Sequence, residues 1–216
     1  MNTLRRLSQI LCTCLYNSYV YGFFAGTIYQ GYLKFIPCPG FNCHSCPGAI
    51  FVCPIGCIQL FAAHGTYFLS LYILGFLTVI GALAGRIICG WACPFGFLQE
   101  LLYKVPVPKI EFPRALEKLR YVMLFGIVFL AAAYTKEPAF CKYICPVGTL
   151  EAGIPLMGLN PDLRMFAGFI FYVKIILLAV LLVIMVFIQR PFCRILCPLG
   201  ALYGFFNYIS FYRLSV

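Results

Sequence analysis

The chain repeats one short motif, Cys-Pro-x-Gly, four times, and this repetition constrains its fold more than any other feature. The four copies are Cys53–Gly56, Cys93–Gly96, Cys145–Gly148 and Cys197–Gly200. In the last three copies a further cysteine stands four residues upstream, at Cys89, Cys141 and Cys193. Because proline lacks a backbone N–H and suits the first position of a helix, each copy predicts a helix that begins directly after a cysteine. Free amides and the positive end of the helix dipole then favour an anionic group beside each thiol.

The rest of the chain is strongly apolar. Of its 216 residues, 63% are hydrophobic and 10% are charged, whereas a soluble domain carries about 25% charged residues. A membrane-spanning helix needs about 20 residues, and the candidate stretches are residues 7–33, 67–88, 121–135 and 166–188. The first is diluted by polar residues and the third is short. We predict an all-α polytopic membrane protein with about four transmembrane helices, folded as one membrane domain over residues 1–216.

Lysine and arginine residues beside these stretches predict the orientation. With a cytoplasmic N-terminus, eleven of them face the cytoplasm and four face the other side. The sequence therefore predicts a multi-pass protein in the lipid bilayer of the cytoplasmic membrane, with its N-terminus in the cytoplasm. The net charge of +10 is then a topology signal, and no nucleic-acid partner is expected.

The motifs also reveal an internal repeat. The segment from Arg86 to Leu98 matches the segment from Arg190 to Leu202 at a constant offset of 104 residues, including the arginine before each cysteine pair. We predict two pseudo-repeats, residues 1–105 and 106–216, related by an axis along the membrane normal. Each would form a hairpin of membrane helices followed by interfacial half-helices that carry the Cys-Pro-x-Gly motifs.

The predicted topology sorts the cysteines into two sets. The spacing Cys-x3-Cys-Pro also ends the bacterial ferredoxin run, and four thiolates hold a [4Fe–4S] cluster. The inner set, on the cytoplasmic side, is Cys89, Cys93, Cys193 and Cys197. The outer set is Cys53, Cys141 and Cys145 plus Cys46 or Cys43, because Ala49 occupies the repeat position of Cys141. We therefore predict two [4Fe–4S] clusters, one toward each membrane face.

Other interpretations of these residues stay open at this point. The inner set also suits a structural zinc site, and disulfides are an alternative on the outer side. Arg86 and Arg190 are predicted to anchor the inner face, and a role in offsetting cluster charge is an alternative. Lys174, inside the last apolar stretch, is expected to extend toward the membrane surface. His44 is either an interfacial residue or a ligand.

The segment from Cys89 to Gly96 reads Cys-Gly-Trp-Ala-Cys-Pro-Phe-Gly and is followed by Gln99 and Glu100. With the other motifs it resembles the membrane-bound 4Fe–4S binding proteins of the NapH and NosR type, over most of the chain from Asn42 to Leu214. This resemblance implies electron transfer through membrane-bound [4Fe–4S] clusters to or from partner redox proteins. Many members of that family continue into a soluble ferredoxin domain, and this chain ends at Val216. We expect no soluble ferredoxin domain here. Either electron transfer through such a domain belongs to a separate subunit, or the protein is a shortened version with a changed role.

The function that follows is a membrane electron-transfer subunit. It would pass single electrons between a cytoplasmic donor, such as a soluble ferredoxin, a flavoprotein or another redox subunit, and an acceptor in or across the membrane. The alternatives are a quinone or metal-ion reductase in its own right, and a non-redox assembly protein with a structural metal. With six acidic residues and two histidines, the chain shows no catalytic residue set and is expected to be a component of an oxidoreductase system rather than a complete enzyme. Clusters at opposite membrane surfaces would be about 30 Å apart, which is too far for efficient transfer. Either the clusters lie near the midplane, or a third carrier lies between them, or each cluster serves its own face.

Overall fold

The computed structural model describes residues 2–65, 67–111, 113–165, 168–207 and 209–211. Tyr212 to Leu214, where the family resemblance ends, lie outside these residues. The described segments are helices joined by loops, with a single isolated parallel bridge between Pro37 and Val52. The predicted all-α class is therefore correct for the part of the chain that the structure describes.

The first half contains the helices up to the second motif. They are α1 (Asn2–Tyr16), α2 (Tyr21–Ala25), the 3-10 helix η1 (Tyr32–Phe35), α3 (Pro54–His64), α4 (Tyr67–Ala84), α5 (Ile87–Trp91) and α6 (Pro94–Leu102).

The second half begins with the 3-10 helix η2 (Arg114–Lys118) and contains three π-helical segments, η3 to η5. Its helices are α7 (Leu119–Val122), η3 (Met123–Ala131), α8 (Ala132–Thr135), η4 (Phe140–Ile144), η5 (Gly148–Gly153), α9 (Ile154–Leu159), α10 (Pro161–Arg164), α11 (Phe169–Phe187), α12 (Pro191–Ile195) and α13 (Pro198–Phe206).

The prediction of about four transmembrane helices is wrong. Among the described residues, one helix is long and apolar enough to cross a membrane, α11 with 19 residues. The predicted stretch 121–135 folds as α7, η3 and α8, which follow one another without a break and combine α-helical and π-helical geometry. The stretch 67–88 ends early because Gly85 takes a left-handed conformation with φ +48° after α4. In that helix the apolar run from Leu71 to Ala84 is shorter than a membrane span.

The first predicted stretch, residues 7–33, fails as a span because its polar residues bind the rest of the protein. The side chain of Gln9 donates to the carbonyl of Gly90 at 2.8 Å. The side-chain amides of Asn17 and Asn42 pair with each other at 3.2 Å. α1 therefore ends at Tyr16 and lies against α5 and α6.

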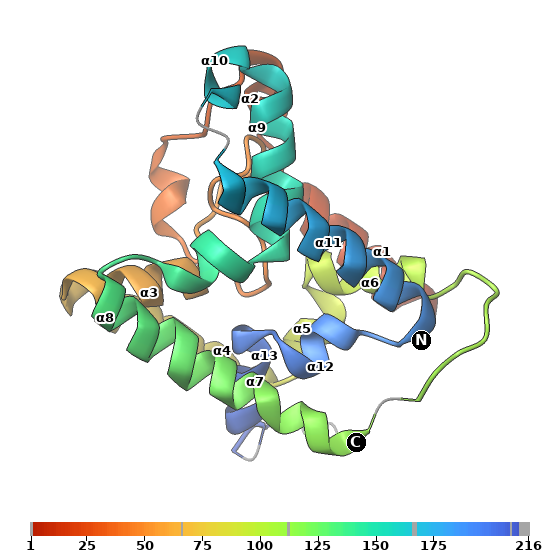
Figure 1. The fold of residues 1–216 in the computed structure, drawn as a ribbon. Coiled ribbons are helices and arrows are strands. Elements are labelled where there is room, and N and C mark those ends of the chain that lie inside the picture. Colours follow the sequence, from red (N-terminus) through yellow and green to blue (C-terminus); the bar gives the residue numbers. More distant parts are fainter. Residues whose placement is uncertain (1, 66, 112, 166–167, 208, 212–216) are drawn as a thin grey trace.

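Figure 1 shows how the longer helices enclose the shorter ones. α11 runs along one side, and the continuous helical segment from α7 to α8 runs along the other. Between them lie α5, α12 and α13, the short helices at the cysteine motifs. α3 packs against α4 and α8.

The centre of the core is a group of four phenylalanine rings from four separate segments. Phe41, from the loop between η1 and α3, has ring centroids 6.5 Å from Phe95, 6.3 Å from Phe140 and 5.6 Å from Phe192. Phe95 and Phe192 meet edge to face at 5.1 Å. All four are at most 2% exposed. Such aromatic pairs add roughly 0.5–1.5 kcal/mol each beyond the burial of their surface.

Candidate functional site

The cysteine motifs start helices as their prolines predict. Cys93 is the N-cap of α6 and Cys197 is the N-cap of α13, each followed by proline at the first helical position. The backbone N–H of Gly96 donates to the Cys93 Sγ at 3.4 Å, and Gly200 donates to the Cys197 Sγ at the same distance. The N–H of Gly148 donates to the Cys145 Sγ at 3.3 Å. Each sulfur thus lies at a helix N-terminus, where amides favour a thiolate.

In two of the motifs the glycine is required by a close backbone approach, at Gly96 and Gly200. A Cβ atom on Gly96 would lie 2.9 Å from the carbonyl oxygen of Cys89, and a Cβ on Gly200 would lie 3.1 Å from that of Cys193. The first turn of each helix therefore packs directly on the carbonyl of the upstream cysteine. This contact holds the two cysteines of a pair beside one another.

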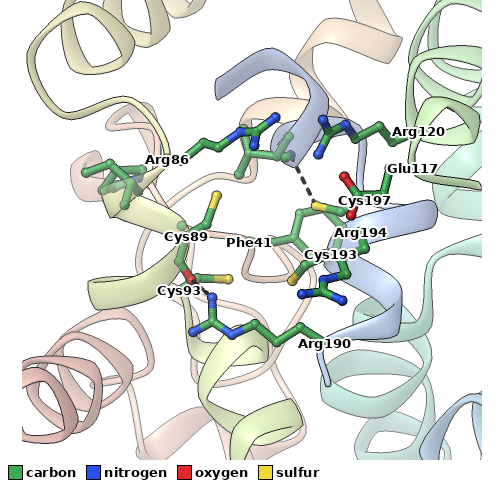
Figure 2. A pocket seen from close by; sticks show the side chains of 15 residues that line it. Phe41, Arg86, Cys89, Cys93, Glu117, Arg120, Arg190, Cys193, Arg194 and Cys197 are labelled. Atoms are coloured by element: carbon green, nitrogen blue, oxygen red, sulfur yellow. Dashed lines mark hydrogen bonds between the residues drawn. The ribbon is translucent and has the colours of Figure 1, made fainter. Parts of the chain in front are cut away.

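The inner set of cysteines surrounds one cavity of about 230 Å³. Its cysteines come from α5, the start of α6, α12 and the start of α13: Cys89, Cys93, Cys193 and Cys197. Figure 2 shows the four sulfur atoms facing a common space, with one pair on each side. We call this space the inner cavity.

The inner cavity is rich in positive charge. Its lining includes one acidic residue, Glu117, and four arginines, Arg86, Arg120, Arg190 and Arg194. Arg190 donates from Nη1 to the carbonyl of Cys89 at 3.2 Å and also pairs with Glu100. The cationic environment favours anionic sulfur ligands in this cavity.

Burial works against free thiolates at the same site. It raises the pKa of the Cys193 thiol to about 12, although nearby Arg190 and a hydrogen bond from Gln99 lower it. Such a thiol loses its proton when it coordinates a metal ion, because the ion stabilises the thiolate.

A second cysteine set surrounds another cavity of about 270 Å³. Its cysteines are Cys43, Cys53, Cys141 and Cys145. Of the two alternatives for the fourth position, Cys43 lines this outer cavity, whereas the described lining does not include Cys46. Cys46 is buried at a turn beside it, with its N–H donating to the Cys43 carbonyl at 3.2 Å.

The outer cavity has fewer charged neighbours. Lys174 lines it and donates to the carbonyl of Cys141 at 3.0 Å, so this side chain does not extend to the surface as expected. His44 also lines the cavity, and burial lowers its pKa. The Glu151 carboxylate accepts the backbone N–H of Cys43 at 2.9 Å, and burial raises the pKa of this carboxyl to about 7.

The donor sets of both cavities fit an iron–sulfur cluster, since each presents four cysteine sulfurs around a void. All thirteen cysteines are free. Across the described residues, no three His, Cys, Asp or Glu side chains converge on a point that could hold a single metal ion. The sulfurs stand around the cavities rather than at one point.

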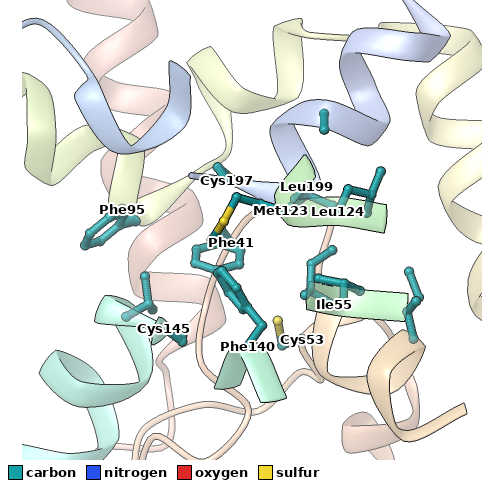
Figure 3. Close-up of a cluster of buried hydrophobic side chains, with 14 of the residues drawn as sticks. Phe41, Cys53, Ile55, Phe95, Met123, Leu124, Phe140, Cys145, Cys197 and Leu199 are labelled. Atoms are coloured by element: carbon teal, nitrogen blue, oxygen red, sulfur yellow. The ribbon is translucent and has the colours of Figure 1, made fainter. Parts of the chain in front are cut away.

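The two cavities are neighbours, which the sequence did not predict. Phe41 lines both of them. Figure 3 shows its ring between Cys197 of the inner set and Cys53 and Cys145 of the outer set. A buried phenylalanine in a loop carries no sequence signal for this position, so it could be found only in the fold.

A family model described as a 4Fe-4S binding domain matches residues 66–113, 119–154 and 170–213, more than half of the chain. The chain belongs to this 4Fe–4S family. Together with the relatives below, this match confirms the predicted resemblance to the NapH and NosR type. The class of cofactor that this family binds is a 4Fe–4S cluster.

Curated relatives support the same family. An uncharacterized protein of Methanocaldococcus jannaschii is 31% identical over 76% of this chain and 66% of its own length. The regulatory protein NosR of Pseudomonas aeruginosa is 33% identical over 61% of this chain and 18% of its own length. The putative electron transport protein YccM of Escherichia coli is 26% identical over 72% of this chain and 43% of its own length. The chain thus spans about two thirds or less of these relatives. No solved structure matches it.

Proposed function

We propose that the chain holds two [4Fe–4S] clusters and passes single electrons between them. Iron in such clusters supplies one-electron redox chemistry when bound. The inner cluster would be held by Cys89, Cys93, Cys193 and Cys197, and the outer cluster by Cys43, Cys53, Cys141 and Cys145. The observation that carries this proposal is that Phe41 lines both cysteine cavities.

The protein's own residues would serve this transfer in two ways. Helix N-terminal amides, such as those of Gly96, Gly148 and Gly200, donate to cysteine sulfurs and stabilise negative charge on them. The phenylalanine core around Phe41 keeps water out of the wall between the cavities. The distance of about 30 Å between two membrane faces would then be no obstacle to transfer, because both cavities have Phe41 in their lining.

The arginines of the inner cavity also favour an acidic redox partner. Arg86, Arg120, Arg190 and Arg194 lie at least partly exposed around this cavity. Opposite charge speeds encounter and fixes orientation between redox proteins. We propose a soluble ferredoxin or flavoprotein as the partner here.

For localisation, we propose that α11 crosses the cytoplasmic membrane. Its 19 residues are apolar and mostly exposed, with 11% of the span buried. Arg190 and Arg194 follow its C-terminal end. Positive charge is typical of a cytoplasmic end, so we propose that this end faces the cytoplasm. Glu100 pairs with both Arg190 and Arg5, so the N-terminal region lies at the same end and we place it in the cytoplasm too.

A second candidate function, reduction of a quinone, is favoured by an apolar cavity beside α11. The cavity of about 320 Å³ is lined by Ile154, Met157, Phe171 and Tyr172 among others. Leu156, on the same short helix α9, lines the outer cavity. Reoxidation of the dithionite-reduced protein by a water-soluble quinone, lost in Phe171→Ala, would support this function. An unchanged rate in that variant would refute it.

The test of the proposed function is the iron and acid-labile sulfide content of anaerobically purified full-length protein. About eight of each per chain are expected for two [4Fe–4S] clusters. About four of each would refute the two-cluster proposal. Zinc without sulfide would refute electron transfer and leave a structural metal site.

A further inference from the structure

The residue six positions after the cysteine of each Cys-Pro-x-Gly motif is polar in all four copies. These residues are Gln59, Gln99, Glu151 and Tyr203. In each case the side chain reaches across to the other half of the chain. The two glutamines of the first half contact cysteines of the second half, and the two residues of the second half contact the loop that contains Phe41.

The two glutamines make equivalent contacts with cysteine sulfurs. Gln59 donates from Nε2 to the Cys141 Sγ at 3.2 Å, and Gln99 donates from Nε2 to the Cys193 Sγ at 3.0 Å. Both glutamines are fully buried, with 0% exposure. Burial of an amide without a partner is costly, so these two hydrogen bonds account for amides in an apolar core.

The two glutamines differ in the contacts of their side-chain carbonyl oxygens. The Gln59 Oε1 accepts the backbone N–H of Phe140 at 2.8 Å, which fixes the orientation of its amide. The Gln99 Oε1 is buried without a partner. The Gln99 Nε2 also reaches the carbonyl of Phe95 at 3.3 Å, as that of Gln59 reaches Ile55 at the same distance. Outside its own helix, the Nε2 of each glutamine therefore donates to the cysteine sulfur alone.

The equivalent residues of the second half contact backbone instead of sulfur. Glu151 accepts the N–H of Cys43 at 2.9 Å, and the Tyr203 hydroxyl donates to the carbonyl of Pro39 at 2.9 Å. A carboxylate cannot donate to a sulfur, so Glu151 could not replace a glutamine. Among the four side chains at this position, only the two glutamines thus donate to a cysteine sulfur.

We propose that Gln59 and Gln99 tune the reduction potentials of the two clusters by donating hydrogen bonds to Cys141 and Cys193. This inference rests on the proposed function. A donor to a cysteine sulfur stabilises the added negative charge of the reduced state, and hydrogen bonds to the sulfurs set cluster potentials. The effect is strong in a buried site of low dielectric. Gln99 would raise the inner potential and Gln59 the outer one.

The test compares Gln59→Met, Gln99→Met and the control Gln9→Met. Methionine is unbranched and of similar length but has no N–H to donate. Gln9 is a matched control because it is also 0% exposed and donates from Nε2 to a backbone carbonyl, that of Gly90. Iron and sulfide are measured first, followed by redox titration monitored by EPR.

Gln99→Met should lower only the inner potential, and Gln59→Met only the outer one. The equilibrium constant for reduction should fall about tenfold in each, which corresponds to about 59 mV for one electron. Gln9→Met should shift neither cluster. Full cluster content with unchanged potentials in both variants, or an equal shift in Gln9→Met, would overturn the tuning role and leave the proposed function intact.

A measurement on the wild-type protein covers the case in which a variant loses its cluster. Glutamine labelled with ¹⁵N in the side-chain amide should give a hyperfine coupling to the reduced clusters, because the two amide nitrogens lie 3.0 and 3.2 Å from cysteine sulfurs. Absence of this coupling in protein with eight irons would overturn the inference. Wild-type protein without iron and sulfide would instead refute the proposed function itself.

Discussion

The two glycines of the segment from Cys89 to Gly96 should respond in opposite ways to substitution by alanine. Gly90 and Gly96 are six residues apart, on either side of Cys93. A Cβ atom on Gly96 would lie 2.9 Å from the carbonyl oxygen of Cys89, where ordinary contact begins at 3.4 Å. A Cβ on Gly90 would have nothing within 4 Å. Gly96→Ala must therefore displace the backbone of a proposed ligand, whereas Gly90→Ala needs no adjustment.

The magnitudes follow from this geometry. Overpacking of about one methyl group against rigid backbone destabilises a protein by about 1–3 kcal/mol. The displaced carbonyl also accepts from Arg190, so Gly96→Ala should disturb the inner site in particular. Gly90 lies inside α5, where alanine is favoured over glycine by about 0.5–1 kcal/mol.

The assay is iron and sulfide content with thermal unfolding of each variant. Gly96→Ala should lose about half of its iron and unfold at lower temperature, and Gly90→Ala should keep wild-type content with equal or higher stability. Full iron content and wild-type stability in Gly96→Ala would refute the packing argument. Loss of iron in Gly90→Ala would show that the contact with the Cys89 carbonyl is not the cause of iron loss in Gly96→Ala.

Three further results are expected. Cys93→Ser should abolish the EPR signal of one cluster and Cys145→Ser that of the other; loss of both signals in each variant would refute separate ligand sets. Arg120→Gln should lower the reduction potential of the inner cluster by on the order of 30–60 mV, because Arg120 lines the inner cavity. Substitution of the exposed Lys118 by Gln should leave this potential unchanged, and equal shifts in both variants would refute a local charge effect. Reduction by an acidic ferredoxin should slow as salt rises, by screening of the arginines; a rate independent of salt would argue against docking at the inner cavity.

The local structure of the motifs could be predicted from the sequence, since proline and glycine act through the nearest backbone. Cys93-Pro94 and Cys197-Pro198 start helices as expected. The predicted topology, although wrong in its number of spans, grouped the same cysteines that line each cavity, apart from the choice between Cys43 and Cys46. That choice depends on the course of an irregular loop and was visible only in the structure.

The number of membrane spans could not be predicted from apolar composition. Composition does not distinguish an apolar segment that faces lipid from one that packs against a cysteine motif, as α1 does through Gln9. Phe41 is one of many phenylalanines, and its place between two cavities depends on the packing of four distant segments. Gln59 and Gln99 did have a signal, because both stand six residues after a motif cysteine, and comparison of the repeats beyond the glycine would have found it.

EPR of the fully reduced protein decides whether two [4Fe–4S] clusters lie side by side across Phe41. The spectrum should be broadened and split by interaction between two reduced clusters, and it should simplify to a single isolated signal in Cys145→Ser. A wild-type spectrum equal to the sum of two independent signals, or to one signal alone, would contradict this arrangement.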